Sequence, residues 1–203
     1  MTLYVKAITI GPTGAGKSSF LNRIVNNKFQ RSTLPTIGVD FFTKEYTQKK
    51  LKVTYWDTAG QEHYNSVSVS YYRNSAIIIC IFDLNDKEGI DDIIKKLKEC
   101  QNSCNSRNII SLIGNKSDQK IDSETLQLNA DKVSDFCHNF NALYYQVSCA
   151  TGENCCESIE LILDTFIQDY EKNKYKYKNV ENMIEINIHQ QQDTSRRRNC
   201  CDI

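Results

Sequence analysis

The chain has 203 residues, of which 40% are hydrophobic and 25% are charged, and this is enough for one globular domain with a sizeable core. Lysine plus arginine and aspartate plus glutamate both number 25, so the net charge is zero and no overall basic field favours nucleic acid as a partner. The nine cysteines are odd in number and scattered. Because no signal peptide and no apolar run of roughly 20 residues accompany them, we expect reduced thiols in a cytosolic protein.

Strand-like and helix-like segments alternate up to Tyr170, which is typical of an α/β fold with a mostly parallel sheet. Continuous apolar runs predict central strands that are covered on both faces, and an apolar repeat of three and four residues predicts helices. Strands are predicted at residues 3–10, 39–46, 51–57, 76–82, 108–114 and 142–147, and helices from near Lys17, Asp91 and Asn129, at 66–72, and around Ile159 to Ile167. We therefore expect a six-stranded, mostly parallel sheet flanked by about five helices.

The composition changes after Tyr170, where Lys, Asn, Gln and Glu dominate and large apolar residues become few. Such a segment buries too little apolar surface to fold by itself. We expect a globular domain at residues 1–170 and a flexible tail at residues 171–203.

A phosphate-binding loop is predicted at residues 11–18, where G-P-T-G-A-G-K-S follows a strand and precedes a helix. Glycines let consecutive N–H groups face a phosphate, and the helix N-terminus adds partial positive charge. Lys17 would neutralise phosphate oxygens and Ser18 would offer its hydroxyl to Mg2+. The residues expected to hold phosphate here are Gly11, Thr13, Gly14, Ala15, Gly16, Lys17, Ser18 and Ser19.

Asp57 ends a predicted strand and opens the sequence D-T-A-G-Q, forty residues after Lys17. Ligands of open α/β sheets bind at the carboxyl ends of the strands. We therefore expect Asp57 to take part in holding Mg2+.

The sequence N-K-S-D at residues 115–118 predicts a guanine site at another strand end. A carboxylate at Asp118 can accept both the N1–H and the N2–H2 donors of guanine, whereas adenine offers neither, so the site would discriminate strongly. Asn115 would address the opposite edge of the base and the stem of Lys116 would lie along the ring. Farther on, Ser148, Cys149 and Ala150 follow the sixth strand, and the Cys149 N–H would reach guanine O6.

These motifs resemble the Ras superfamily over residues 3–170, and within it the Rab branch. The resemblance rests on P-T-I-G-V-D-F at 35–41, W-D-T-A-G-Q-E at 56–62, Y-Y-R at 71–73 and the terminal Cys200-Cys201. It implies that Thr36 closes on Mg2+ and the γ-phosphate, that Gly60 donates to the γ-phosphate and that Gln61 orients the attacking water. The Mg2+ set would be Ser18, Thr36 and Asp57.

The same resemblance implies that Phe29 packs against guanine. Phe41, Trp56 and Tyr71 match an aromatic triad that shows the nucleotide state to effectors, although core packing is an equal explanation for Tyr71. A lysine is usual at the position of Ala150, which predicts looser packing over the base and a lower nucleotide affinity.

The ending Cys200-Cys201-Asp202-Ile203 resembles the site at which Rab proteins receive two geranylgeranyl groups. Two lipid chains anchor a protein stably, and three preceding arginines would add about 1 kcal/mol each near an anionic leaflet. The implied partners are an exchange factor, a GTPase-activating protein, effectors, a prenylation escort and a GDP-dissociation inhibitor. We expect a monomer attached reversibly to the cytosolic face of intracellular membranes.

Two other interpretations remain open from the sequence. One is a prenylated binding module that holds guanine nucleotide and barely hydrolyses it, which Ala150 favours and Gln61 opposes. The other is an ATP-using kinase, which Asp118 opposes.

Overall fold

The computed structural model describes residues 2–31, 35–59, 71–103 and 107–177. A six-stranded sheet runs through the molecule in the order β2-β3-β1-β4-β5-β6. All neighbouring strands are parallel except β2 and β3, which form an antiparallel hairpin. The strands are β1 (Leu3–Ile10), β2 (Val39–Tyr46), β3 (Leu51–Thr58), β4 (Ile77–Asp83), β5 (Ile109–Asn115) and β6 (Leu143–Gln146). The expected fold class and strand set are confirmed, and each strand end agrees with the prediction or differs from it by one residue.

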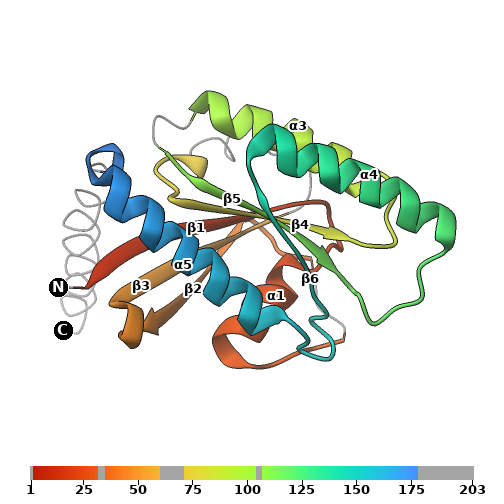
Figure 1. Ribbon diagram of the computed structural model, residues 1–203. Coiled ribbons are helices and arrows are strands. Elements are labelled where there is room, and N and C mark those ends of the chain that lie inside the picture. Colours follow the sequence, from red (N-terminus) through yellow and green to blue (C-terminus); the bar gives the residue numbers. More distant parts are fainter. Residues whose placement is uncertain (1, 32–34, 60–70, 104–106, 178–203) are drawn as a thin grey trace, which may run out of the picture.

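Helices cover both faces of the sheet (Figure 1). They are α1 (Lys17–Asn26), α3 (Gly89–Ser103), α4 (Ser123–Phe140) and α5 (Cys155–Asn173), with short 3-10 turns η1 (Thr47–Lys49) and η3 (Lys174–Tyr177). The described residues thus contain four of the roughly five α-helices expected. Of the helix predicted at residues 66–72, all but the last two residues lie outside those described.

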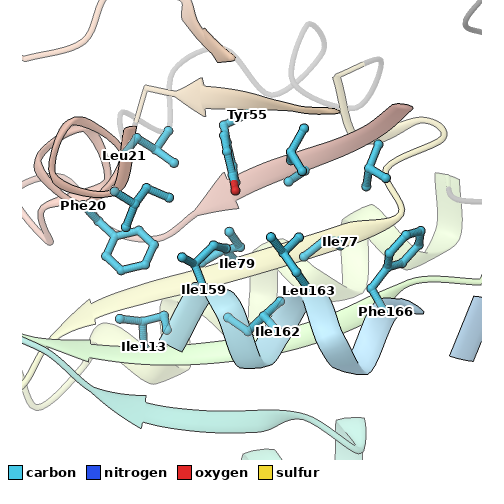
Figure 2. Packing of buried hydrophobic residues seen from close by; sticks show 14 of the residues in the cluster. Phe20, Leu21, Tyr55, Ile77, Ile79, Ile113, Ile159, Ile162, Leu163 and Phe166 are labelled. Carbon is cyan, nitrogen blue, oxygen red and sulfur yellow. The ribbon is translucent and has the colours of Figure 1, made fainter. Parts of the chain in front are cut away.

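Two apolar clusters hold the layers together. On one face, Phe20 and Leu21 of α1 and Ile159 and Leu163 of α5 pack on strand residues such as Ile79 (Figure 2). The other face packs α3 and α4 on β4 and β5. Burial of side chains of this size contributes roughly 1.5–3 kcal/mol each to the free energy of folding, so these two clusters stabilise the packing of the helices on the sheet.

The start of α4 differs from the sequence prediction. The helix begins at Ser123, six residues before the expected Asn129, because Asp122 caps it. The Asp122 carboxylate accepts hydrogen bonds from the backbone N–H of Thr125 at 2.9 Å and from its hydroxyl at 2.6 Å. A cap of this type satisfies helix N–H groups that would otherwise lack partners.

The packed part of the chain also extends past the predicted boundary at Tyr170. α5 continues to Asn173, and η3 folds back so that the ring of Tyr177 is fully buried against Phe166, with ring centroids 5.5 Å apart. The Tyr177 hydroxyl donates to Asp169 at 2.7 Å. Residues 171–177, the first part of the tail predicted at 171–203, therefore belong to the folded domain, and the rest of that tail lies outside the described residues.

Candidate nucleotide site

A cavity of about 600 Å³ opens at the edge of the sheet where β1, β3, β5 and β6 end. Parallel strands bring their carboxyl ends to one edge, so the loops that follow them meet there although they are distant in the sequence. The cavity is lined by Thr13, Gly14, Gly16, Lys17, Ser18, Ser19, Phe29, Gln30, Arg31, Pro35, Thr36, Asn115, Lys116, Asp118, Gln119, Cys149 and Ala150.

The loop between β1 and α1 requires glycine where it approaches other backbone and side chains. Gly16 has φ +95°, and a Cβ added there would lie 2.2 Å from Nδ2 of Asn115. The missing side chain lets Asn115 donate from Nδ2 to the carbonyl of Ala15 at 2.8 Å. No described side chain caps the N-terminus of α1, where Gly16 is left-handed. Its N–H groups are therefore available to an anion.

Lys17, the first residue of α1, is buried against this loop. Its ammonium donates to the carbonyls of Gly11 at 3.0 Å and Pro12 at 2.9 Å. Burial and, after it, the positive charge of Lys96 lower the pKa of Lys17 to about 8, and the negative charge of Asp57 opposes this shift. An ammonium with so few compensating negative charges is suited to pair with an anionic ligand.

Three oxygen-bearing side chains meet beside the loop. The Ser18 hydroxyl lies 2.9 Å from that of Thr36 and donates to the carboxylate of Asp57, and the Thr36 hydroxyl lies 3.4 Å from the same carboxylate oxygen. Thr9 also donates to Asp57 at 3.3 Å. Burial raises the pKa of Asp57, and the hydroxyl of Ser18 and the charge of Lys17 counteract this.

This oxygen cluster fits a magnesium ion. Mg2+ prefers oxygen ligands and usually keeps only one or two carboxylates alongside phosphate oxygens and waters. A cation would also offset the cost of the buried Asp57 charge. Within the described ranges no three His, Cys, Asp or Glu side chains gather as a metal site, so a ligand would have to complete the coordination.

The other end of the cavity presents the polar groups that were predicted to read a base. Asp118 accepts a hydrogen bond from the Ser148 hydroxyl at 2.6 Å, which orients its carboxylate. Asn115 accepts at Oδ1 from the N–H of Cys149 at 3.2 Å. The ammonium of Lys116 lies 2.7 Å from the carboxylate of Asp83. Asn115 thus connects the phosphate loop, through Ala15, to the loop that carries Cys149.

The predicted residues take different places around this cavity. Four of them do not line it: Gly11, Ala15, Asp57 and Ser148. Each of these instead makes a hydrogen bond to a residue that lines the cavity. Sequence reasoning missed four lining residues, Gln30, Arg31, Pro35 and Gln119. Gln30, Pro35 and Gln119 directly neighbour predicted residues and Arg31 follows Gln30, which is the signal that could have found them. Gly60, Gln61, Cys200 and Cys201 lie outside the described residues.

The aromatic residues singled out in the sequence lie in contact beside β2 and β3. The ring centroids of Phe41 and Trp56 are 4.7 Å apart at 82°, and those of Trp56 and Tyr71 are 5.9 Å apart. The ammonium of Lys6 lies 3.7 Å from the centroid of the Trp56 ring and donates to the carbonyl of Tyr71 at 2.6 Å. Phe41 is 59% exposed, so the cluster reaches the surface, whereas Trp56 and Tyr71 also pack against the core.

Comparison with known proteins agrees with these features. The sequence pattern of the Ras family matches residues 6–168. The chain is similar to the GTP-binding protein YPT53 of Saccharomyces cerevisiae, with 34% identity over 75% of this chain and 72% of that protein. It is 36% identical to the Ras-related protein Rab-4 of Dictyostelium discoideum over 73% of this chain and 72% of that protein. The Ras-related protein SEC4 of Saccharomyces cerevisiae is 30% identical over 97% of this chain and 91% of its own length.

Proposed function

We propose, from the premise that this chain belongs to the Ras family and is a Rab-type small GTPase, that its cavity alternates between GTP and GDP and so switches the protein between two states in vesicle-mediated membrane traffic. As a family member the chain binds guanine nucleotide and hydrolyses GTP to GDP and phosphate. One observation carries the proposal: the phosphate loop and the Asn115 to Asp118 loop enclose one cavity and are joined by the Asn115 to Ala15 hydrogen bond.

In the proposed site, Lys17 and the N-terminal N–H groups of α1 hold the phosphates, and Ser18, Thr36 and Asp57 hold Mg2+. When bound, the ion neutralises charge on the phosphate oxygens. Lys17 now donates to loop carbonyls, and these contacts would give way to phosphate oxygens as nucleotide binds. Lys17 and the N–H groups of α1 are therefore in place to bind phosphate before the reaction begins.

At the base end, Asp118 accepts from guanine N1–H and N2–H2, and Phe29 packs on the ring. The N–H of Cys149, which already donates to Oδ1 of Asn115, would share its hydrogen with O6. Ser148 keeps the Asp118 carboxylate in one orientation. A site that hydrogen-bonds ligand donors rejects analogues without them by factors on the order of 10^4. This accounts for selection of guanine over adenine.

For the hydrolysis step we propose that Gln61 orients a water, which attacks the γ-phosphorus while the bond to the β–γ bridging oxygen breaks and GDP leaves. The N–H groups of Thr36 and Gly60 hold the γ-phosphate until then. Its loss releases these two segments, and effectors read the change. Intrinsic turnover is slow, because an activating protein supplies an arginine worth on the order of 10^3 to 10^5 in rate.

Single-turnover hydrolysis of bound GTP tests this step. The wild-type protein should hydrolyse GTP slowly, faster with Mg2+ than without it, and Gln61→Leu should abolish stimulation by an activating protein. Gln127→Leu, an exposed glutamine on α4, is the matched control and should behave as wild type. Equal hydrolysis by Gln61→Leu and wild type would leave the binding-module interpretation in place.

For membrane attachment we propose geranylgeranylation of Cys200 and Cys201, with delivery by a prenylation escort and retrieval by a GDP-dissociation inhibitor. None of the helices among the described residues is long and apolar enough to cross a membrane. Replacing both cysteines by serine should move the protein from the membrane fraction to the supernatant, whereas Cys156→Ser, an exposed cysteine on α5, should not. Unchanged membrane association of the double variant would refute the lipid anchor.

The aromatic cluster of Phe41, Trp56 and Tyr71 supplies the proposed effector surface. Phe41 and Trp56 pair across β2 and β3, the strands that connect Thr36 to Asp57, and the ring of Tyr71 packs against Trp56. Exchange factor, activating protein and effectors would approach here. Phe41→Ala should weaken capture of a GTP-dependent effector and leave GDP binding unchanged, and loss of both would contradict this placement.

A further inference from the structure

Arg23 makes contacts that the motifs of the chain do not explain. It lies on α1 and reaches the loop that follows β6, 126 residues farther along the chain. Its Nε donates to the carbonyl of Cys149 at 3.0 Å, and its Nη2 donates to the carbonyl of Ala150 at 2.9 Å. The fork of one guanidinium thus holds two consecutive carbonyls, with the added strength of charge-assisted hydrogen bonds.

Arg23 reaches this loop from behind. It does not line the cavity, whereas Cys149 and Ala150 do. Its Cζ lies 5.9 Å from the ring centroid of Phe29, which lines the same cavity. A Cβ built on Gly152, at φ +92°, would lie 3.7–3.8 Å from the Arg23 side chain, so this glycine borders the guanidinium as well.

Fixing these carbonyls fixes the N–H groups that face a base. The N–H of Cys149 is held from the other side by Oδ1 of Asn115 at 3.2 Å. Its carbonyl is held by Arg23, so both ends of the residue are fixed. Because a trans peptide is planar, holding the Cys149 carbonyl also directs the N–H of Ala150 away from Arg23.

The side chain of Ala150 cannot cover a base, since it ends at one methyl group where a lysine is usual. Arg23 supplies a long cation to the same loop from α1, the helix that begins with Lys17 of the phosphate loop. One helix therefore connects the phosphate end of the cavity to the base end.

We propose that Arg23 is a positioning residue for the guanine base, because its hydrogen bonds to the carbonyls of Cys149 and Ala150 fix the loop whose backbone N–H groups would face O6. This inference rests on the proposed function, because it deepens the account of the same cavity. Arg23→Met should increase the GDP dissociation rate by roughly tenfold, and Arg23→Lys, which keeps the charge but loses the fork, should restore part of the difference.

A change in GDP affinity alone does not separate positioning from a general structural role, so 6-thioguanosine diphosphate is the second ligand. It keeps the N1–H and N2–H2 donors but replaces O6 with a sulfur that accepts hydrogen bonds weakly. Wild-type protein should prefer GDP over this analogue, and the preference should shrink at least threefold in Arg23→Met. Arg107→Met, which removes a guanidinium paired with Asp169, should leave the preference unchanged.

These measurements distinguish failure of the positioning role from failure of the proposed function. If wild-type protein binds no guanine nucleotide, the proposed function fails. If it binds GDP and Arg23→Met, with a wild-type circular dichroism spectrum, weakens both ligands by the same factor, only the positioning role is overturned. A smaller preference for O6 in Arg23→Met and partial rescue by Arg23→Lys support it.

Discussion

Asp118 is the single carboxylate that, in the proposed site, would decide which base the cavity accepts. The Ser148 hydroxyl donates to one of its oxygens at 2.6 Å, and Thr151 in turn donates its N–H to that hydroxyl at 3.1 Å. The carboxylate is thereby oriented before any ligand arrives, which lowers the cost of binding. We therefore expect base selectivity to depend on this one residue and on the two that support it.

We expect Asp118→Asn to exchange guanine for xanthine. The amide of asparagine can donate to the second carbonyl of xanthine, whereas it can no longer accept both donors of guanine. GDP affinity should fall on the order of 100-fold and xanthosine diphosphate affinity should rise, as measured by competition with a fluorescent GDP. Asp131→Asn on α4 is the matched control, and retained GDP affinity in Asp118→Asn would contradict the assignment of this residue.

At the scale of elements, α5 and η3 form one packed unit that reaches beyond the predicted domain end. Tyr177 contacts both Phe166 and Tyr170, with ring centroids 5.5 and 5.6 Å away. Each such aromatic contact adds to the free energy of burial. The short 3-10 turn is what brings this ring back to the helix that precedes it.

A chain that stops after Tyr170 should be less stable than one that stops after Tyr177. Loss of the buried ring should cost roughly 3–5 kcal/mol in the free energy of unfolding and lower the melting temperature on the order of 10 °C. Thermal unfolding in excess GDP measures the difference. Equal melting temperatures for the two chains would show that residues 171–177 add nothing to the domain.

Asp169 makes the stability of the same unit depend on pH. Burial opposes its charge, but hydrogen bonds from Arg107, at 2.6 and 2.7 Å, and from Tyr177 outweigh this and lower the pKa of the carboxyl below 3.8. A lowered pKa in the folded state stabilises the fold above the unfolded value, and the contribution is lost as pH falls through the folded value.

Wild-type protein should therefore be more stable than Asp169→Asn at pH 7 and pH 5, and the difference should shrink as pH falls below 3.8. Urea unfolding at several pH values measures it. Asp92→Asn, which removes a pair with the exposed Lys95, is the control and should show little difference at any pH. A difference between wild type and Asp169→Asn that grew in acid would contradict the lowered pKa.

Elements and site residues could be predicted from the sequence where they depend on patterns of neighbouring residues. The strands at β4 and β5 are continuous apolar runs, and Lys17, Asp57 and Asp118 lie in motifs that follow strands, so their convergence at one sheet edge follows from parallel topology. The early start of α4 was missed because its cap, Asp122, precedes the apolar period that marked the helix. Tyr177 and Arg23 were missed because their contacts depend on tertiary folding, across 126 residues in the case of Arg23.

Across the whole molecule, the β2–β3 hairpin joins the nucleotide site to the proposed effector surface. Thr36 precedes β2 and Asp57 lies near the end of β3, and the hairpin pairs Asp40 with Asp57 and Phe41 with Trp56. The proposed metal ligands and the exposed aromatic residues therefore belong to one pair of strands. A change at the phosphate end has a short covalent route to the surface.

The central claim is that one cavity selects guanine nucleotide at its base end while the loop before α1 holds the phosphates. Its most direct test is displacement of a fluorescent GDP from the purified full chain by GTP and by ATP, in the presence of Mg2+. We predict displacement by GTP at near-stoichiometric concentrations and by ATP only at an excess on the order of 10^3 or more. Equal displacement by ATP would contradict the account.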